Sequence, residues 1–195
     1  MATQEAAPGT VRLAGLRDVG ALVRLYRTQL DEPRRWVTPF PFDRPRLTIV
    51  FTGLILARPV LGLVRRIRPG WAHWVLVAES SGVVVGVGFV HLARANDRRW
   101  IGRTGLLVAP PERGKGWGTR LKRAQILLCD RERIERIQAY LQGGNAASRR
   151  VNERLGLQIR PSGPDDPVRP VGPYLIAEGD VRRLAAALEE GAAHR

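Results

Sequence analysis

The chain has 195 residues, of which 44% are hydrophobic and 26% are charged, and this composition excludes a disordered or collagen-like protein. Its 32 basic residues outnumber the 18 acidic ones, which gives a net charge of +14 and favours anionic ligands. A single cysteine, Cys129, excludes an internal disulfide, and the first ten residues lack a secretory signal pattern, so we expect a cytoplasmic protein. We expect a single domain over residues 1–195, with its core over about residues 10–178.

The first segments show one strand pattern and one helix pattern. Weak alternation over Val11–Leu16 predicts a strand. Asp18 is a typical N-cap residue, and the apolar spacing after it predicts a helix over Val19–Leu30. The loop Pro33–Pro45 then carries three aromatic residues among prolines. Aromatic residues on a loop either hold a ligand or fill the core, and both interpretations stay open here.

The segment Leu47–Val64 is apolar over 18 residues and lies within an extra helical region expected over residues 33–70. It is long enough to reach across a bilayer. However, Arg58 and Pro59 lie near its middle, where an arginine costs about 2.5–3.5 kcal/mol on insertion scales. Because proline interrupts helices, we expect two short helices that form an apolar wall. Contact with an anionic membrane surface, through the arginines of Arg65–Arg68, is the less favoured alternative.

A sheet is predicted next. Runs rich in β-branched residues over His73–Glu79, Val83–Ala93 and Arg99–Val108 are separated by short turns, and they predict three antiparallel strands. A glycine-rich loop follows the third strand. After it, apolar residues spaced four, three and four positions apart predict a helix over Trp117–Arg131.

The last third of the chain completes a strand–helix–strand–helix unit. A strand is predicted over Ile134–Leu141, parallel to the strand before the glycine-rich loop, and a helix over Ala146–Leu155. Proline at every third position of Pro161–Pro173 predicts a stiff extended connector in the polyproline II conformation. A final strand over Tyr174–Glu178 and a helix over Val181–Glu190, within residues 179–195, end the chain.

The glycine-rich loop Arg113–Gly118 lies where a strand meets the start of a helix. Without a Cβ atom, Gly114, Gly116 and Gly118 allow the backbone to approach a ligand and turn its N–H groups outward. At a helix N-terminus these groups favour an anion, and an arginine and a lysine between the glycines add positive charge. The loop matches neither the Walker A nor the dinucleotide pattern, but it predicts a phosphate or pyrophosphate site.

Two motifs together resemble the GNAT superfamily of N-acetyltransferases. Arg113–Gly118 has the Arg-x-x-Gly-x-Gly pattern of the family's acetyl-CoA loop, and it is preceded by the Leu-x-Val-x-Pro pattern of Leu106–Pro110. The segment Asn145–Leu157 keeps the frame of a second family motif, Asn-x-x-Ala-x-x-Leu-Tyr-x-x-x-Gly-Phe. The resemblance covers about residues 10–178.

The resemblance implies the GNAT fold, an α/β (α+β) architecture with a splayed, mixed and mostly antiparallel sheet flanked by helices. It also implies transfer of an acetyl group from acetyl-CoA to a small-molecule or peptide amine, with no metal. The N–H of Val108 would stabilise the oxyanion. The implied acetyl-CoA-binding residues are Leu106, Val108, Arg113, Gly114, Lys115, Gly116, Trp117, Gly118, Thr119, Asn145, Ser148 and Arg149.

The catalytic side chains depart from the family pattern. Where the second motif has the tyrosine that often protonates the leaving thiolate, this chain has Asn152, which is not a general acid at ordinary pH. Some relatives carry a glutamate early in the strand before the loop, and Trp100–Leu106 contains no carboxylate. We therefore take His91 and Tyr140 as candidate catalytic residues, although both have common structural roles.

Two other functions compete with acetyl transfer. The missing acid and base favour a non-catalytic GNAT-fold module that binds acyl-CoA as a regulator or adaptor. The net charge of +14 favours a binder of nucleic acid or of an anionic membrane surface, but the arginines are scattered along the chain rather than clustered. A homodimer is left open.

Overall fold

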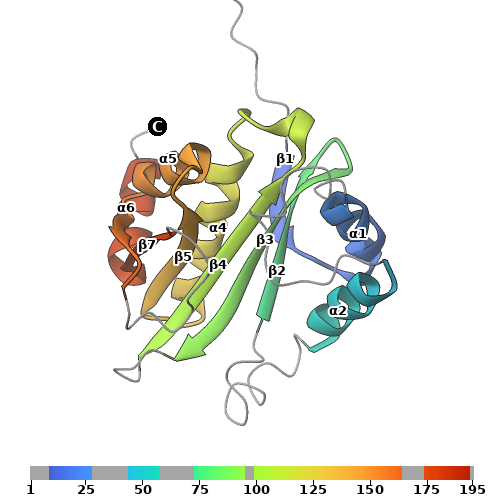
Figure 1. Ribbon diagram of the computed structural model, residues 1–195, viewed down its shortest axis with the longest axis horizontal. Coiled ribbons are helices and arrows are strands. Elements are labelled where there is room, and N and C mark those ends of the chain that lie inside the picture. The colour runs from blue at the N-terminus through green and yellow to red at the C-terminus, as the bar shows by residue number, and fades with distance from the viewer. Residues whose placement is uncertain (1–8, 28–43, 58–72, 95–98, 164–173, 194–195) are drawn as a thin grey trace, which may run out of the picture.

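The computed structural model describes residues 9–27, 44–57, 73–94, 99–163 and 174–193. They form one twisted sheet with helices on both faces (Figure 1). The elements are β1 (Gly9–Leu13), the 3-10 helix η1 (Leu16–Asp18), α1 (Val19–Arg27), α2 (Arg44–Ala57), β2 (His73–Ser80), β3 (Val83–Arg94), β4 (Trp100–Val108), the 3-10 helix η5 (Pro110–Glu112), α4 (Trp117–Arg131), β5 (Arg136–Gln142), α5 (Ala146–Arg154), β6 (Gln158–Pro161), β7 (Tyr174–Asp180) and α6 (Val181–Ala193).

The sheet has seven strands in the order β1-β2-β3-β4-β5-β7-β6. Strands β4 and β5 are parallel, and every other neighbouring pair is antiparallel. The parallel pair is the one joined through the glycine-rich loop and α4, because a parallel connection needs a crossover long enough to hold a helix. The predicted mixed, mostly antiparallel sheet flanked by helices is confirmed.

The two central strands pair over only part of their length. Residues Ile101–Arg103 of β4 pair with Arg136–Gln138 of β5. At the next position the Thr104 hydroxyl donates to the Gln138 carbonyl at 2.9 Å, so a side chain ends the ladder. We call the unpaired edges beyond this point, residues 104–108 of β4 and 139–142 of β5, the splay.

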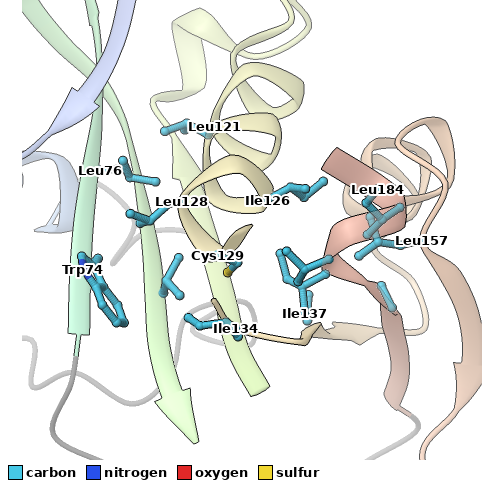
Figure 2. Close-up of a cluster of buried hydrophobic side chains, with 14 of the residues drawn as sticks. Trp74, Leu76, Leu121, Ile126, Leu128, Cys129, Ile134, Ile137, Leu157 and Leu184 are labelled. Atoms are coloured by element: carbon cyan, nitrogen blue, oxygen red, sulfur yellow. The ribbon is translucent and has the colours of Figure 1, made fainter. Parts of the chain in front are cut away.

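The larger hydrophobic core lies between the sheet and the helices α4 and α6, as Figure 2 shows. Cys129 of α4 is fully buried in it, and burial raises the pKa of its thiol to about 12, which makes it unreactive. A Cβ atom on Gly102 would lie 2.7 Å from the Cys129 sulfur, so a glycine is needed for α4 to approach β4. The labelled residues of this core are Trp74, Leu76, Leu121, Ile126, Leu128, Cys129, Ile134, Ile137, Leu157 and Leu184.

A second core on the opposite face packs α1 and α2 against β2 and β3. Phe51 of α2 stacks on Phe89 of β3, with ring centroids 6.1 Å apart and an interplanar angle of 19°. Helix α2 is the first of the two apolar helices predicted within Leu47–Val64, but it begins earlier, at Arg44. The second predicted helix lies outside the described residues. Among the described helices, none combines the length and the apolar character that a membrane span requires.

Several element boundaries differ from the sequence predictions. Strand β1 covers Gly9–Leu13 instead of Val11–Leu16, because its register against β2 pairs Gly9 with Ser80. Strand β6 was not predicted. It is a short strand at the edge of the sheet that ends in a proline, and proline is tolerated only at such edges.

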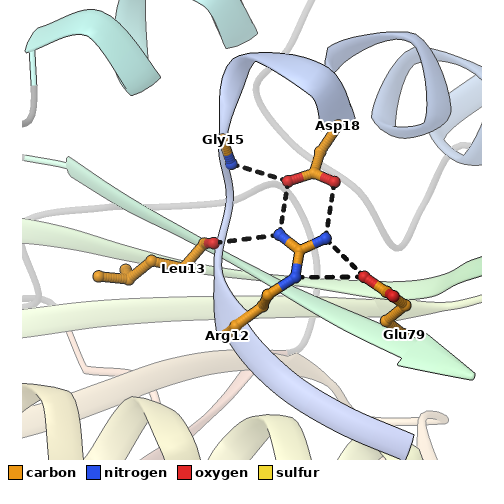
Figure 3. A network of polar contacts seen from close by, with 5 residues as sticks. All are labelled: Arg12, Leu13, Gly15, Asp18 and Glu79. Atoms are coloured by element: carbon orange, nitrogen blue, oxygen red, sulfur yellow. Dashed lines mark hydrogen bonds and ion pairs between the residues drawn. The ribbon is translucent and has the colours of Figure 1, made fainter. Parts of the chain in front are cut away.

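Asp18 does not act as the predicted N-cap of α1. Its carboxylate accepts hydrogen bonds from the Gly15 N–H at 2.7 Å and from both terminal nitrogens of Arg12 at 2.7 and 2.9 Å. The same guanidinium donates to Glu79 of β2 (Figure 3). Arg12 therefore ties β1 to the start of α1 and to β2, and its hydrogen bonds hold the pKa of Asp18 below the usual range.

Replacing Arg12 with methionine should destabilise the protein by about 2 kcal/mol, because it leaves the buried Asp18 carboxylate without its cation. The Asp18 side chain is only 5% exposed. Glu79→Gln is the control and should cost less, since Glu79 is 27% exposed. Urea denaturation measures both losses. The effect of Arg12→Met should shrink as the pH falls below about 4, because Asp18 takes up a proton in the unfolded chain there while Arg12 still holds it ionised in the folded wild-type protein. Equal losses in the two variants would contradict this account.

Candidate functional site

The glycine-rich loop exposes the start of α4. Gly114 and Gly116 have φ values of +80° and +84°, a region that favours glycine. A Cβ atom at either position would meet nothing within 4 Å, so the space beside the loop is open. Gly116 is the N-cap of α4, and no side chain caps the helix. The N–H groups of the first turn are therefore directed at the place where an anion would bind.

The charges beside the loop are partly paired. The exposed Arg113 donates through Nε to the Val108 carbonyl at 3.2 Å. Lys115 forms an ion pair with Glu112 at 2.9 Å, and the Trp117 indole donates to the same carboxylate at 3.3 Å. Sequence reasoning missed Glu112, whose pKa is lowered chiefly by the hydrogen bond from Lys115. Trp117 is 3% exposed, so its side chain is largely covered by the protein.

The edge of β4 that faces the splay presents backbone groups that do not pair with β3 at two predicted positions. The Ala109 N–H donates to the Val85 carbonyl of β3 at 2.9 Å. In an antiparallel pair, hydrogen-bonded and non-bonded positions alternate, so Val108, which lies opposite Gly86, directs its N–H and C=O away from β3. The same holds for Leu106, two residues earlier. The outward backbone groups of both residues therefore face β5, beyond the last residues at which β4 and β5 pair.

The predicted residues of α5 lie at its start, next to α4. The Asn145 carbonyl oxygen Oδ1 caps the helix by accepting from the Ser148 N–H at 2.9 Å, a structural role that leaves its amide NH₂ to donate. Arg149 pairs with Glu153 at 2.7 Å. Asn152 is 1% exposed and donates to the Ser148 carbonyl. Within the described residues, its Oδ1 atom is buried without a hydrogen-bond partner.

The two candidate catalytic residues are not brought together. His91 lies on β3, directly opposite His73 of β2 and Arg103 of β4. Its Nδ1 contacts Nε2 of His73, and the two ring centroids are 4.2 Å apart. Burial, with the charges of His73 and Arg103, lowers the pKa of His91 to about 4. His91 is therefore neutral at physiological pH, but it is a weak base.

Tyr140 borders the splay directly. It lies on β5 beyond the last residue paired with β4. Its neighbours Ala139 and Leu141 pack into the core beside α4, and strand alternation places Tyr140 on the opposite face. That face is the one that α1 and α2 cover over β2 and β3. Of the two candidates, Tyr140 is thus the nearer to the unpaired edges.

A carboxylate also lies on this face, although β4 carries none. Glu178 of β7 accepts hydrogen bonds from Arg136 at 3.1 Å, Gln138 at 2.8 Å and Arg160 at 2.8 Å. Burial favours its protonated form, but the bonds from Arg160 and Gln138 prevail and lower its pKa. Glu178 therefore stays ionised and paired, which suits it to hold β5, β6 and β7 together rather than to accept protons.

Two buried polar residues of α4 reach the central strands, and sequence reasoning missed both. Lys122 is 1% exposed and Gln125 is fully buried. The Gln125 amide donates to backbone carbonyls of β3 and β4, and Lys122 donates to Thr104 at 2.7 Å. The one available signal was spacing: Lys122 follows the buried Leu121 and lies seven positions before Cys129, which places it beside the helix's buried face.

A cavity of about 840 Å³ lies elsewhere, between α1, the β2–β3 turn and η5. Its lining includes Arg17 of η1, Arg24 of α1, Val83 at the start of β3, and Pro110 of η5. No residue of the splay lines it. The unpaired edges of β4 and β5, together with the start of α4, therefore make up the candidate site.

Comparisons with known proteins identify the family and the fold. A family model described as Acetyltransferase (GNAT) domain matches residues 10–158. Solved structures of similar fold include the three that follow. The yncA protein from Salmonella typhimurium, with its cofactor acetyl-CoA, is 22% identical, with a TM-score of 0.67 over 89% of this chain and 94% of that one. No curated protein matches the sequence significantly.

The other two structures have different acceptors in their names. The ribosomal-protein-S5-alanine acetyltransferase from Vibrio fischeri is 14% identical, with a TM-score of 0.68 over 88% of this chain and 92% of that one. The phosphinothricin acetyltransferase from Sinorhizobium meliloti, in complex with acetyl-CoA, is 17% identical, with a TM-score of 0.65 over 88% of each chain.

Proposed function

Because the chain belongs to the GNAT acetyltransferase family, we propose that it is an N-acetyltransferase that transfers the acetyl group of acetyl-CoA to an amine. One observation carries this proposal. The glycine-rich loop at the start of α4 lies at the end of the same strand whose unpaired edge faces the splay. The proposed phosphate site and the backbone groups of β4 that face the splay would therefore follow one another along a single path.

The residues present fit acetyl-CoA as the acyl donor. The N–H groups at the start of α4, around Gly116, would hold the pyrophosphate. The backbone N–H and C=O groups of Leu106 and Val108 that face the splay would hydrogen-bond to the amides of the pantetheine arm. The arm would thus take the place of a neighbouring strand. The Val108 carbonyl already accepts a hydrogen bond from Arg113. A pantetheine amide would have to replace Arg113 as its donor. The buried Oδ1 atom of Asn152, which has no partner among the described residues, supplies a further acceptor beside α4.

In the proposed reaction the acceptor amine attacks the thioester directly. The N–H of Val108 faces the splay and would stabilise the oxyanion. Positioning two reactants supplies several kcal/mol of the barrier, so a missing general acid does not abolish the reaction. Tyr140 borders the splay and is better placed than His91 to contact the acceptor. Its hydroxyl can both donate and accept hydrogen bonds, so Tyr140 would orient the amine.

The acceptor class is open between a protein N-terminus and a small amine, since relatives of similar fold are named for each. An experiment should therefore combine acetyl-CoA with a panel of both kinds and follow thiol release. Titration calorimetry with CoA runs in parallel. We expect micromolar to millimolar CoA affinity and thiol release with at least one amine.

Two outcomes would favour the competing functions. CoA binding without turnover across the panel would support the non-catalytic acyl-CoA module. A lack of CoA binding, together with salt-dependent retention on RNA or on anionic vesicles, would support the nucleic-acid or membrane binder.

A further inference from the structure

The cavity of about 840 Å³ between η1, α1, the β2–β3 turn and η5 has no part in the proposed reaction. Its volume is within the range of small-molecule sites, about 300–1,000 Å³. Neither the splay nor the glycine-rich loop Arg113–Gly118 contributes a residue to its wall. The cavity is therefore separate from the proposed acetyl-CoA site, and its own side chains indicate what it could bind.

Most of the residues around the cavity are apolar. They include Ala21 and Leu25 of α1, Val84 of β3, and Pro110 and Pro111 of η5. A ligand with an apolar body would displace water from this wall, which is favourable in proportion to the apolar area that both surfaces bury. The wall therefore favours a ligand that is partly apolar.

Two arginines of the cavity wall have no bonded partner. Arg17 of η1 and Arg24 of α1 both line the cavity, and among the described residues neither forms a hydrogen bond or an ion pair. Arg17 acts on the neighbouring Asp18 through its charge alone. A Cβ atom on Gly20 would lie 3.6 Å from Nη1 of Arg24, so the Arg24 side chain folds back along α1. Its guanidinium thus lies at the end of α1 that adjoins Arg17.

The third arginine of the wall, Arg12, is committed to the protein. Its five hydrogen bonds go to Asp18, Glu79 and the Leu13 carbonyl (Figure 3), and a guanidinium has five N–H donors. Asp18 and Glu79 are the two carboxylates of the cavity, and both are held by Arg12. Three arginines against two carboxylates leave one net positive charge in the wall, which favours an anion.

We propose that this cavity is a second ligand site, which binds a small organic anion with an apolar body. Arg17 and Arg24 would hold the anionic group, a carboxylate or a phosphate ester, because planar guanidinium groups bind such oxygens through paired N–H donors. The apolar body would lie against the residues of α1, β3 and η5. This inference does not depend on the proposed function, since no residue of the acetyl-CoA site takes part in it.

The test uses three probes that share one apolar body, added to the full isotope-labelled chain and followed by two-dimensional NMR. Hexanoate and hexyl phosphate carry the anion, and hexanamide is their neutral counterpart. Both anions should shift the amide signals of Gly82 and Ala109, which line the cavity, with dissociation constants of about 1 mM or less. Hexanamide should bind at least about tenfold more weakly. The tighter of the two anions shows whether the site prefers a carboxylate or a phosphate ester.

Substitution of the two arginines locates the anionic group. The double variant Arg17→Gln, Arg24→Gln should weaken hexanoate binding at least about tenfold, because it removes both charged donors. Arg27→Gln is the matched control. Arg27 is exposed on the same helix but does not line the cavity, so its replacement makes a similar change of charge and should keep wild-type affinity.

A second pair of variants leaves the arginines in place. Val83 lines the cavity and is 62% exposed, so the fold should tolerate a polar residue there. Val83→Glu brings a negative charge to the cavity and should weaken hexanoate binding about tenfold by repulsion. Val83→Gln has nearly the same shape without the charge and should bind more tightly than Val83→Glu. Circular dichroism shows whether each variant is folded, and this pair carries the test if the arginine double variant is not.

Three results would overturn the inference. A lack of saturable shifts with both anions would show that the cavity holds no such ligand. An equal loss in Arg27→Gln and in the double variant would show that hexanoate only samples the net charge of +14. Displacement of hexanoate by CoA would place the probe in the acetyl-CoA site, whereas two independent sites require that saturating CoA leave its affinity unchanged. None of these results depends on whether the protein transfers acetyl groups.

Discussion

Replacing Gly116 with glutamate is expected to weaken CoA binding at least about 100-fold while leaving the fold intact. The backbone φ of Gly116 is +84° and a Cβ atom there would meet nothing within 4 Å, so the substitution costs only about 1–2 kcal/mol of backbone strain. The new carboxylate would lie beside the phosphates. At about 5 Å and an effective dielectric constant of about 20, like charges repel by about 3 kcal/mol, which corresponds to about 100-fold in affinity.

Gly82→Glu is the matched control. Gly82 has a φ of +77° in the β2–β3 turn, and a Cβ atom there would also meet nothing within 4 Å. The control therefore adds the same charge and a similar strain in a different turn, and it should keep wild-type CoA affinity. Titration calorimetry with CoA compares the two variants, and thermal denaturation compares their stability. Equal affinities would show that the loop at α4 is not the phosphate site.

Replacing Val108 with proline is expected to lower kcat about 100-fold, because it removes an N–H group that the proposed reaction uses for the oxyanion. The substitution spares the sheet. Val108 lies at a position of β4 that is not hydrogen-bonded to β3, as the neighbouring bond from Ala109 to Val85 shows. Proline is tolerated in a strand where its N–H makes no ladder bond. The amine that gives the fastest thiol release serves as acceptor.

Val108→Ala separates the amide from the side chain. It shortens the side chain but keeps the N–H, and its kcat should stay within a few-fold of the wild-type value. Calorimetry with CoA then shows whether the proline variant still binds the donor. A large loss of affinity with unchanged kcat would assign the Val108 amide to the pantetheine arm instead of the oxyanion. Wild-type values for both quantities would remove Val108 from the site.

The sequence alone was sufficient for the parts of the site that depend on local backbone. Gly114 and Gly116 adopt the positive φ values that their residue type allows, and the spacing of apolar residues after them defines α4. The parallel pairing of β4 and β5 follows from the connection through α4.

Predictions failed where long-range contacts compete with local preference. Asp18 has the residue type of a helix cap, but an arginine on a neighbouring strand captures its carboxylate. Strand β6 is too short and too close to a proline to be recognised, and it forms because β7 offers an edge. The candidate bases are a similar case. Sequence cannot show that His91 faces another histidine across the sheet, a contact that helps to lower its pKa.

The sequence by itself determined the glycine-rich loop, the order of strands and helices around it, and the family that both indicate, because turn geometry and hydrophobic periodicity are local properties of the chain. Only the tertiary structure decided where the ladder between β4 and β5 ends, which way the amide of Val108 points, and that Lys122 lies beneath Thr104. Each of these depends on the register between segments that are distant in sequence, and register is set by how the two cores pack on the sheet.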